Sequence, residues 1–224
     1  MKEFFKRQIE LWGQKSQERL QEKSVAIIGC GGLGSSLALA LGASGIGTIH
    51  LVDFDEVSRH NIHRQITFTL QDTGKAKAKV NEEIILKRSP FVKVQSYVEG
   101  FEEFAARSIE VDLILDATDN LPTRAAIDRF AKERGIPWIY TSVEEFNAQV
   151  CFMDKASFEA FRITERTPGG IAAPIVMLAA SFEANLALRY LAGLHIKKDQ
   201  LYYLFFDQNG EFGVQKFAMP LAEG

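Results

Sequence analysis

Short apolar runs alternate with amphipathic segments along the first two thirds of the chain. Runs rich in β-branched residues predict buried strands, whereas apolar residues spaced three and four apart predict helices. The predicted strands are 25–29, 48–53, 92–98, 111–116 and 138–143, and the predicted helices between them are 35–44, 75–87 and 123–134. Strands that alternate with helices predict an α/β fold, a doubly wound Rossmann-like sheet that is mostly parallel.

Both ends of the chain depart from this alternation. Residues 3–22 predict an amphipathic helix ahead of the first strand, and 174–191 predict a long helix near the C-terminus. Further strands are predicted at 149–153, 201–207 and 211–217, with a hairpin signal, DQNG, at 207–210. We expect these strands to extend the sheet with antiparallel members. Because no linker or repeat interrupts the chain, residues 1–224 are expected to form a single domain.

Composition excludes several classes of protein. With 46% hydrophobic and 25% charged residues among 224, the chain is typical of a soluble globular protein. A formal net charge of -3 argues against a broad surface for nucleic acid or for an anionic membrane. The long apolar segment contains Glu183, Asn185 and Arg189, which a membrane span would resist, and no signal peptide is recognisable at the N-terminus. We therefore expect a cytoplasmic protein.

A glycine cluster follows the first predicted strand. Gly29, Gly31 and Gly34 match the pattern GxGxxG, and Gly32 adds a fourth glycine. Such a loop turns tightly and brings backbone amides close to a phosphate, near the positive end of the following helix. Asp53 ends the next predicted strand, where a carboxylate can accept from ribose hydroxyls. The pattern predicts a nucleotide with a free ribose and leaves its identity open.

Charged residues beyond this loop favour ATP over NAD. Arg64 and Lys77 lie in the segment that would return over the nucleotide, where they could neutralise a triphosphate. Asp116 and Asp119 lie where the predicted strand 111–116 becomes a loop, and an acidic group beside phosphates calls for an intervening Mg²⁺. Two alternatives remain open: the cations could merely solvate the surface, and Asp119 or Asn120 could cap the next helix.

Several motifs occur together in the order found in one family. They are RQIELWGQ, GCGGLGS, DFDEV, N-x-x-R-Q, the lysine after DTG, DATDN-x-x-x-R and GGIAAPIVMLAASFEANLALRYLAG. Over nearly its whole length the chain resembles the ubiquitin-activating-enzyme-like adenylyltransferases of the ThiF/MoeB/HesA type. The resemblance implies an enzyme that uses ATP and Mg²⁺ to adenylate the C-terminal carboxylate of a small ubiquitin-like sulfur-carrier protein ending in Gly-Gly, releasing pyrophosphate. Carriers of the thiamine and molybdopterin types both fit it.

The resemblance also implies roles for individual residues. Arg7 would reach the ATP of a neighbouring subunit, which implies a homodimer. In the nucleotide site itself, Gly32 would contact the nucleotide, and Asp53 and Asp55 would lie on its ribose side. Asn61, Arg64 and Lys77 would hold and polarise the phosphates. Asp119 would bind magnesium. Residues 1–24 would then be an N-terminal helical arm, 25–145 a nucleotide-binding half and 146–224 a half for carrier binding and dimerisation.

The chain departs from larger members of that family in its cysteines. It contains only Cys30 and Cys151 and no CxxC pair, so the zinc-binding cysteines are missing and no zinc is expected. No cysteine lies between Cys151 and Pro174, where a thioester with the carrier would form. We therefore expect an enzyme that stops at the carrier-adenylate and leaves sulfur delivery to another protein.

Other functions remain as alternatives. A carrier-independent relative, such as a tRNA threonylcarbamoyladenosine dehydratase, would be expected to show a more basic surface. An inactive partner subunit that only binds a carrier would have no use for Arg64, Lys77 and Asp119 together. An NAD oxidoreductase would leave Asp119 and the arginines unexplained.

Overall fold

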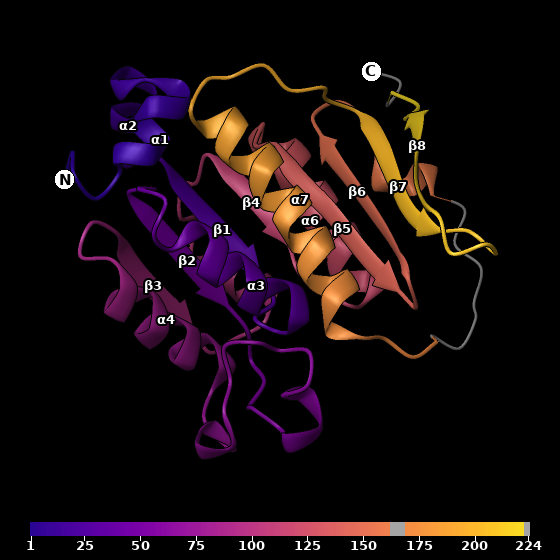
Figure 1. The fold of residues 1–224 in the computed structure, drawn as a ribbon, viewed down its shortest axis with the longest axis horizontal. Coiled ribbons are helices and arrows are strands. Elements are labelled where there is room, and N and C mark those ends of the chain that lie inside the picture. Colours follow the sequence, from indigo (N-terminus) through magenta and orange to yellow (C-terminus); the bar gives the residue numbers. More distant parts are fainter. Residues whose placement is uncertain (162–168, 222–224) are drawn as a thin grey trace.

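One mixed sheet organises the chain in the computed structural model, which describes residues 1–161 and 169–221. Within these residues eight strands lie in the order β3-β2-β1-β4-β5-β6-β7-β8 (Figure 1). The first five strands along the chain run parallel, and the last three are antiparallel, which confirms the predicted fold class. The strands are β1 (Ser24–Ile28), β2 (Thr48–Val52), β3 (Lys93–Tyr97), β4 (Leu113–Asp116), β5 (Trp138–Glu144), β6 (Asn147–Met153), β7 (Gln200–Phe206) and β8 (Phe212–Ala218).

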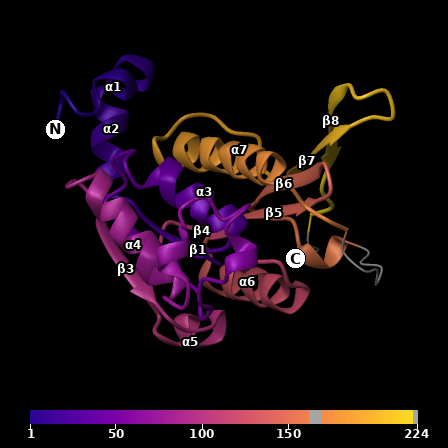
Figure 2. The same ribbon diagram turned by 60° about the horizontal axis from the view of Figure 1, so that its bottom comes forward.

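Helices cover both faces of the sheet (Figure 2). One face packs against α3, α4 and α7 in a core that includes Leu37, Ile85 and Ala180, and the other against α5 and α6 through Phe104 and Ile127. The helices are α1 (Lys6–Trp12), α2 (Gln14–Gln21), α3 (Gly32–Leu41), α4 (Lys77–Arg88), α5 (Phe101–Ala106), α6 (Leu121–Arg134) and α7 (Ala173–Leu191), with 3-10 turns at Arg59–Asn61, Leu70–Asp72 and Phe158–Ala160.

The order of the strands reverses at β1. The chain continues from β1 to β2 and β3 on one side, and then returns to place β4 on the other side of β1. The carboxyl ends of β1 and β4 are therefore neighbours, with Ile28 in register with Asp116. In doubly wound sheets this reversal opens a crevice between the loops that follow the two strands.

Three elements differ from the sequence prediction. The expected helix 3–22 is broken into α1 and α2 at Gly13, which takes φ +83°, a conformation that side chains rarely tolerate. The helix expected at 35–44 begins earlier, at Gly32, because the last glycines of the loop already form its first turn. Helix α5 was not predicted, because its six residues bury Phe101 and Phe104 without a run long enough to show helical periodicity.

The C-terminal region follows the prediction more closely. Strands β7 and β8 form a hairpin whose turn is closed by the backbone bond from Asp207 N to Glu211 O, 2.9 Å, with Gly210 at φ +79°. Helix α7 packs against α3 and against strands β5 and β6. None of the helices in the described part of the chain is long and apolar enough to cross a membrane.

Candidate nucleotide-binding site

A cleft of about 590 Å³ opens where the parallel strands end. Its walls come from the segments after β1, β2, β3 and β4, from the carboxyl end of β5 and from the first turn of α7. The side chains and backbone that line it include Gly29, Gly31, Gly32, Asp53, Phe54, Asp55, Arg64, Gln65, Lys77, Phe101, Thr118, Asp119, Asn120, Arg124, Ser142, Glu144 and Val176.

Two glycines of the loop after β1 are required by close backbone contacts. Gly29 takes φ +93°, and a Cβ there would lie 2.6 Å from the carbonyl oxygen of Ala117. A Cβ on Gly34 would overlap the carbonyl oxygen of Gly29. These contacts hold the start of α3 against the sheet, so that Gly31, Gly32 and the positive end of α3 face the cleft.

Asp53 is held in place by backbone amides. Its Oδ2 accepts from the N–H of Cys30 at 2.6 Å, and its Oδ1 accepts from the N–H of Asp55 at 2.7 Å. Burial raises the pKa of the Asp53 carboxyl above its usual value, and these two N–H groups oppose that rise. Each oxygen keeps acceptor capacity toward the cleft, which suits a hydroxyl donor such as a ribose.

Two cations reach the same cleft. Lys77, at the start of α4, is only 6% exposed, and its Nζ donates to Oδ2 of Asp55 at 2.7 Å. Arg64 is half-buried, and its Nη1 lies 3.0 Å from Nε2 of His63. Because a guanidinium can only donate, Nε2 of His63 acts as the acceptor in this pair. Both cations thus lie on the wall of the cleft, among acidic residues that include Asp55.

The acidic residues after β4 have different environments. Asp119 is exposed and lines the cleft, whereas Asp116 is fully buried. The cap of α6 is Asn120, whose Oδ1 accepts from the N–H of Thr123 at 2.9 Å, so capping does not account for Asp119. Asp119 is thus placed to meet a cation bound to phosphates in the cleft.

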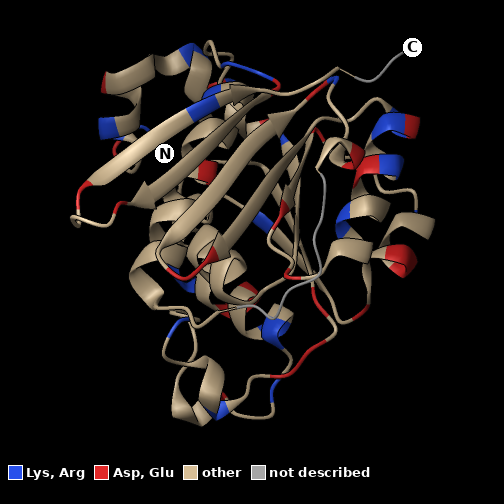
Figure 3. Ribbon diagram, turned by 90° about the vertical axis from the view of Figure 1, so that its right-hand side faces the viewer, with Lys and Arg blue, Asp and Glu red and all other residues tan. Residues whose placement is uncertain are grey.

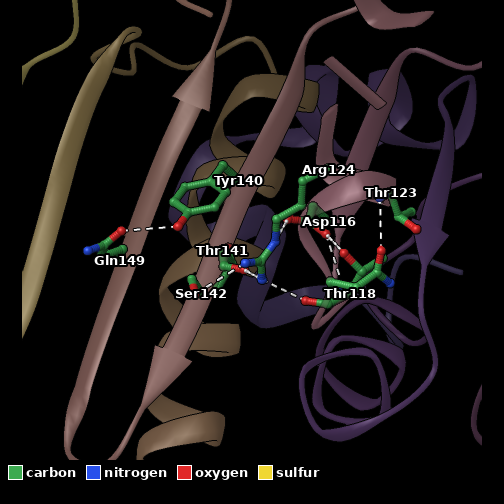
Figure 4. A network of polar contacts seen from close by, with 9 residues as sticks. Asp116, Thr118, Thr123, Arg124, Tyr140, Thr141, Ser142 and Gln149 are labelled. Atoms are coloured by element: carbon green, nitrogen blue, oxygen red, sulfur yellow. Dashed lines mark hydrogen bonds and ion pairs between the residues drawn. The ribbon is translucent and has the colours of Figure 1, made fainter. Parts of the chain in front are cut away.

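The carboxylate of Asp116 is bound by a hydrogen-bond network around Arg124 (Figure 4). Its Oδ2 accepts from Arg124 Nε at 3.0 Å, and its Oδ1 accepts from the N–H and the hydroxyl of Thr118. Burial raises the pKa of Asp116, with Arg124 the main opposing influence. The guanidinium also donates to the carbonyl oxygens of Thr118, 2.6 Å, and Thr141, 3.0 Å. Asp116 is therefore a structural anchor rather than a free metal ligand.

Arg124 lines the cleft, although the sequence analysis did not predict it as a site residue. The signal was present, since Arg124 is the arginine that closes the motif DATDN-x-x-x-R. An arginine in the first turns of a helix is usually a solvated residue, so its burial could not be read from the pattern alone. Here it is 5% exposed.

Three predicted site residues lie away from the cleft lining. The side chain of Arg7 is 92% exposed on α1 and pairs with Glu10 at 2.9 Å. Asn61 is buried in the turn Arg59–Asn61, beside the segment that carries Arg64, and does not itself line the cleft. Gly34 instead packs against the backbone of Gly29, where a side chain would not fit. The remaining predicted residues surround one space.

Both cysteines are buried. Burial raises the pKa of the Cys30 thiol well above its usual value and that of Cys151 to about 12. Part of the segment between Cys151 and Pro174, residues 162–168, lies outside the described residues. Within the residues described, no group of three or more His, Cys, Asp or Glu is arranged to hold a metal ion.

Comparison with known proteins places this geometry in a family. The profile of the ThiF family matches residues 5–223. The chain belongs to the ThiF family. This ThiF member is 36% identical over 140 residues to a sulfur carrier protein adenylyltransferase of Thermus thermophilus, a match that covers 62% of this chain and 52% of that protein. It is 28% identical over 200 residues to the sulfur carrier protein ThiS adenylyltransferase of Escherichia coli, covering 83% and 78% of the two chains.

Solved structures agree on the architecture. The structure of Escherichia coli MccB with MccA-N7isoASN superposes with a TM-score of 0.87 at 19% identity, covering 99% of this chain and 75% of MccB. At that identity the likeness establishes the fold. The ThiF member thus shares its complete described sheet arrangement with a larger protein, while it spans about half the length of the Thermus relative.

Proposed function

We propose that this ThiF family member is an ATP-dependent adenylyltransferase that activates the C-terminal carboxylate of a small ubiquitin-like sulfur-carrier protein ending in Gly-Gly. One observation carries the proposal: a glycine loop, two cations and an exposed carboxylate surround a single cleft of about 590 Å³ at the strand reversal. The names of the relatives support the choice of a sulfur carrier as substrate.

The residues of the cleft suit ATP with Mg²⁺. Asp119 would repel bound phosphates unless a cation lay between them, and Mg²⁺ is commonly held by one or two carboxylates together with phosphate oxygens. When bound there, Mg²⁺ would neutralise charge on the phosphates. Asp53 would accept from the ribose, and Gly31 and Gly32 would let the loop approach the phosphates closely.

The reaction needs positioning and positive charge more than proton transfer. A carboxylate oxygen of the carrier forms a bond to the α-phosphorus while the bond from that phosphorus to the bridging oxygen breaks. Pyrophosphate leaves with the electron pair. Lys77 and Arg64 bring together two anionic reactants and stabilise the charge on the phosphoryl group. A carboxylate is already nucleophilic, so the chain needs neither a catalytic thiol nor a general base for this step.

The C-terminal strands supply a surface suited to a protein partner. Strands β6 and β7 contain no charged residue, and β8 contains only Lys216, as the mostly tan sheet in Figure 3 shows. Three apolar side chains on one face of β7 and β8 are 44–48% exposed: Phe206, Phe212 and Val214. This surface would receive the carrier, while its C-terminal tail would enter the cleft.

The assembly implied by this function is a homodimer in the cytoplasm. Among the described residues the side chain of Arg7 pairs with Glu10 alone, and it would complete the ATP site of the other subunit. A separate protein would deliver sulfur to the carrier-adenylate. Carriers of the thiamine and molybdopterin types are both candidate substrates, and no zinc is required.

Exchange of labelled pyrophosphate into ATP tests the proposal and separates it from the alternatives. The enzyme is assayed with Escherichia coli ThiS, with a molybdopterin-type carrier, with each carrier lacking its last glycine, and with tRNA carrying threonylcarbamoyladenosine. We expect exchange with at least one intact carrier and none with the truncated forms. Exchange with the tRNA alone would indicate a dehydratase. Binding of ATP without exchange on any substrate would refute adenylation.

A further inference from the structure

A glutamate lies in the apolar interior beneath the proposed site. Glu183, in the middle of α7, is 0% exposed. Within the described part of the chain, neither of its carboxyl oxygens has a hydrogen-bond partner of good geometry. Burial raises the pKa of Glu183 well above its usual value, and a buried carboxyl group without a partner favours the neutral acid over the carboxylate. A buried polar group without a partner costs stability, which calls for a reason for its presence.

The hydroxyl of Thr141 is the polar group that faces this acid. It lies near enough to lower the pKa of Glu183, although its Oγ1 also lacks a well-formed hydrogen bond to any described residue. Thr141 belongs to β5, and Ile139, two residues earlier, packs in the same core as α7. A neutral carboxyl group and a hydroxyl can each donate to and accept from the other.

Thr141 connects the acid to the cleft through the sheet. Its carbonyl oxygen accepts from Nη2 of Arg124 at 3.0 Å, and the next residue, Ser142, accepts from Nη1 at 3.4 Å. Both Ser142 and Arg124 line the cleft. A side chain on α7 and the guanidinium at the site therefore contact one short piece of β5, from opposite faces of the sheet.

Burial is the main cause of the raised pKa of Glu183, and the nearby charges act on it in both directions. Asp116 raises its pKa and Arg124 lowers it, so one cation serves two buried carboxyl groups. Asp116 holds the negative charge, because Arg124 and Thr118 already donate to it. Of the other elements packed on α7, α3 has no titratable residue, Cys151 of β6 belongs to the opposite core, and the charged residues of α2 are exposed.

We propose that Glu183 is a positioning residue for adenylation: its neutral carboxyl group donates to Thr141 and fixes the part of β5 that holds Arg124 at the cleft. This role rests on the proposed function. A charged carboxylate could not donate, and it would place a second negative charge beside Asp116. The arrangement therefore works only while Glu183 is protonated.

The test compares Glu183→Gln, which keeps a neutral donor, with Glu183→Leu, which removes all polarity at similar volume. We expect Glu183→Leu to melt near the wild-type temperature, because the loss of its bond to Thr141 is offset by the removal of a buried carboxyl group. Its kcat for carrier-dependent exchange should fall about tenfold with little change in KM for ATP, as a slight misplacement of a site group would produce. Glu183→Gln should restore most of kcat.

The pH dependence supplies a second readout that does not require the leucine variant to fold. The folded-state pKa of Glu183 is raised, so its stability contribution is complete below the unfolded value near 4.5 and is lost as pH rises toward the folded value. The melting temperature of Glu183→Gln should therefore exceed that of the wild type by a margin that grows above pH 4.5. In exchange assays, kcat of the wild type should decline at alkaline pH and that of Glu183→Gln should not.

Two outcomes separate this inference from the proposed function. Wild-type kcat in Glu183→Leu, or identical alkaline profiles in the wild type and Glu183→Gln, would overturn the role of Glu183 and leave adenylation intact. An absence of exchange in the wild type itself would overturn the proposed function, and the positioning role with it.

Discussion

Lys77 and Asp55 are joined twice, once by side chains and once by backbone. Lys77 Nζ lies 2.7 Å from Asp55 Oδ2, and the N–H of Lys77 donates to the carbonyl oxygen of Asp55 at 2.9 Å. The two side chains differ in exposure, 7% for the lysine and 51% for the aspartate. The backbone bond fixes the start of α4 beside the loop after β2, and the charge of a buried lysine is thereby directed into the cleft.

Loss of this lysine should affect chemistry more than folding. In Lys77→Ala the remaining Asp55 is half exposed, so water can solvate its charge and no buried ion is left unpaired. The rate of carrier-dependent pyrophosphate exchange should fall by about 10²–10³-fold. Lys75→Ala is the matched control, because Lys75 pairs with Asp72 outside the cleft lining. Equal exchange rates in the two variants would remove Lys77 from the site.

The glycine loop makes a prediction about stability. Gly29 and Gly74 both have positive φ, +93° and +83°, but a Cβ would meet Ala117 at Gly29 and open space at Gly74. Gly74→Ala should lower the free energy of unfolding by about 1–2 kcal/mol from backbone strain alone. Gly29→Ala should cost about 1–3 kcal/mol more, because the backbone must also shift. Urea unfolding of both variants measures the difference, and equal losses would show that close packing is not the reason for Gly29.

The cysteines should be inert in the folded protein. Thiolates react and thiols do not, and burial raises the pKa of Cys151 to about 12 and that of Cys30 well above its usual value. An aromatic disulfide reagent at pH 8 should therefore label neither cysteine until the protein is unfolded with guanidinium. Cys151→Ala should still form the carrier-adenylate. If that variant folds and binds ATP but cannot activate a carrier, a covalent enzyme intermediate is required.

The alternation of apolar and amphipathic segments predicted where most strands and helices lie along the chain, because buried parallel strands and surface helices have distinct periodicities. The break at Gly13 was not predictable, since a glycine inside a helical pattern is often tolerated and only its positive φ reveals the break. Helix α5 was missed because six residues give less than two turns of periodicity.

The site residues that belong to recognisable sequence motifs could be predicted. Three of the loop glycines (Gly29, Gly31 and Gly32) line one cleft together with Asp53, Lys77 and Asp119. Asp116 is buried and Asp119 is exposed, although they lie only three residues apart. The difference depends on Arg124 of α6, which binds Asp116 and which no local sequence pattern identifies as its partner. Arg124 and Glu183 were not recognised as parts of a site because their burial depends on how α6 and α7 pack across the sheet.

Arg7 provides a test of assembly. If each ATP site is completed by Arg7 of the other subunit, a mixed dimer of Arg7→Ala and Lys77→Ala chains contains one site with both lesions and one with neither. Mixing two inactive proteins should then restore part of the exchange activity. The exposed Arg7–Glu10 pair is too weak to make Arg7→Ala a folding mutant. Mixed dimers that form but remain inactive would exclude the cross-subunit role.

Carrier-dependent pyrophosphate exchange in Asp119→Ala tests most directly that the cleft performs adenylation. The matched control is Asp112→Ala, which removes an aspartate just before β4, at the opposite end of the strand that Asp119 follows. We predict that Asp119→Ala lowers the exchange rate by about 10²–10³-fold at saturating Mg²⁺, while Asp112→Ala keeps the wild-type rate. Wild-type exchange in Asp119→Ala would contradict the account, because the carboxylate expected to hold magnesium against the phosphates would then have no part in the reaction.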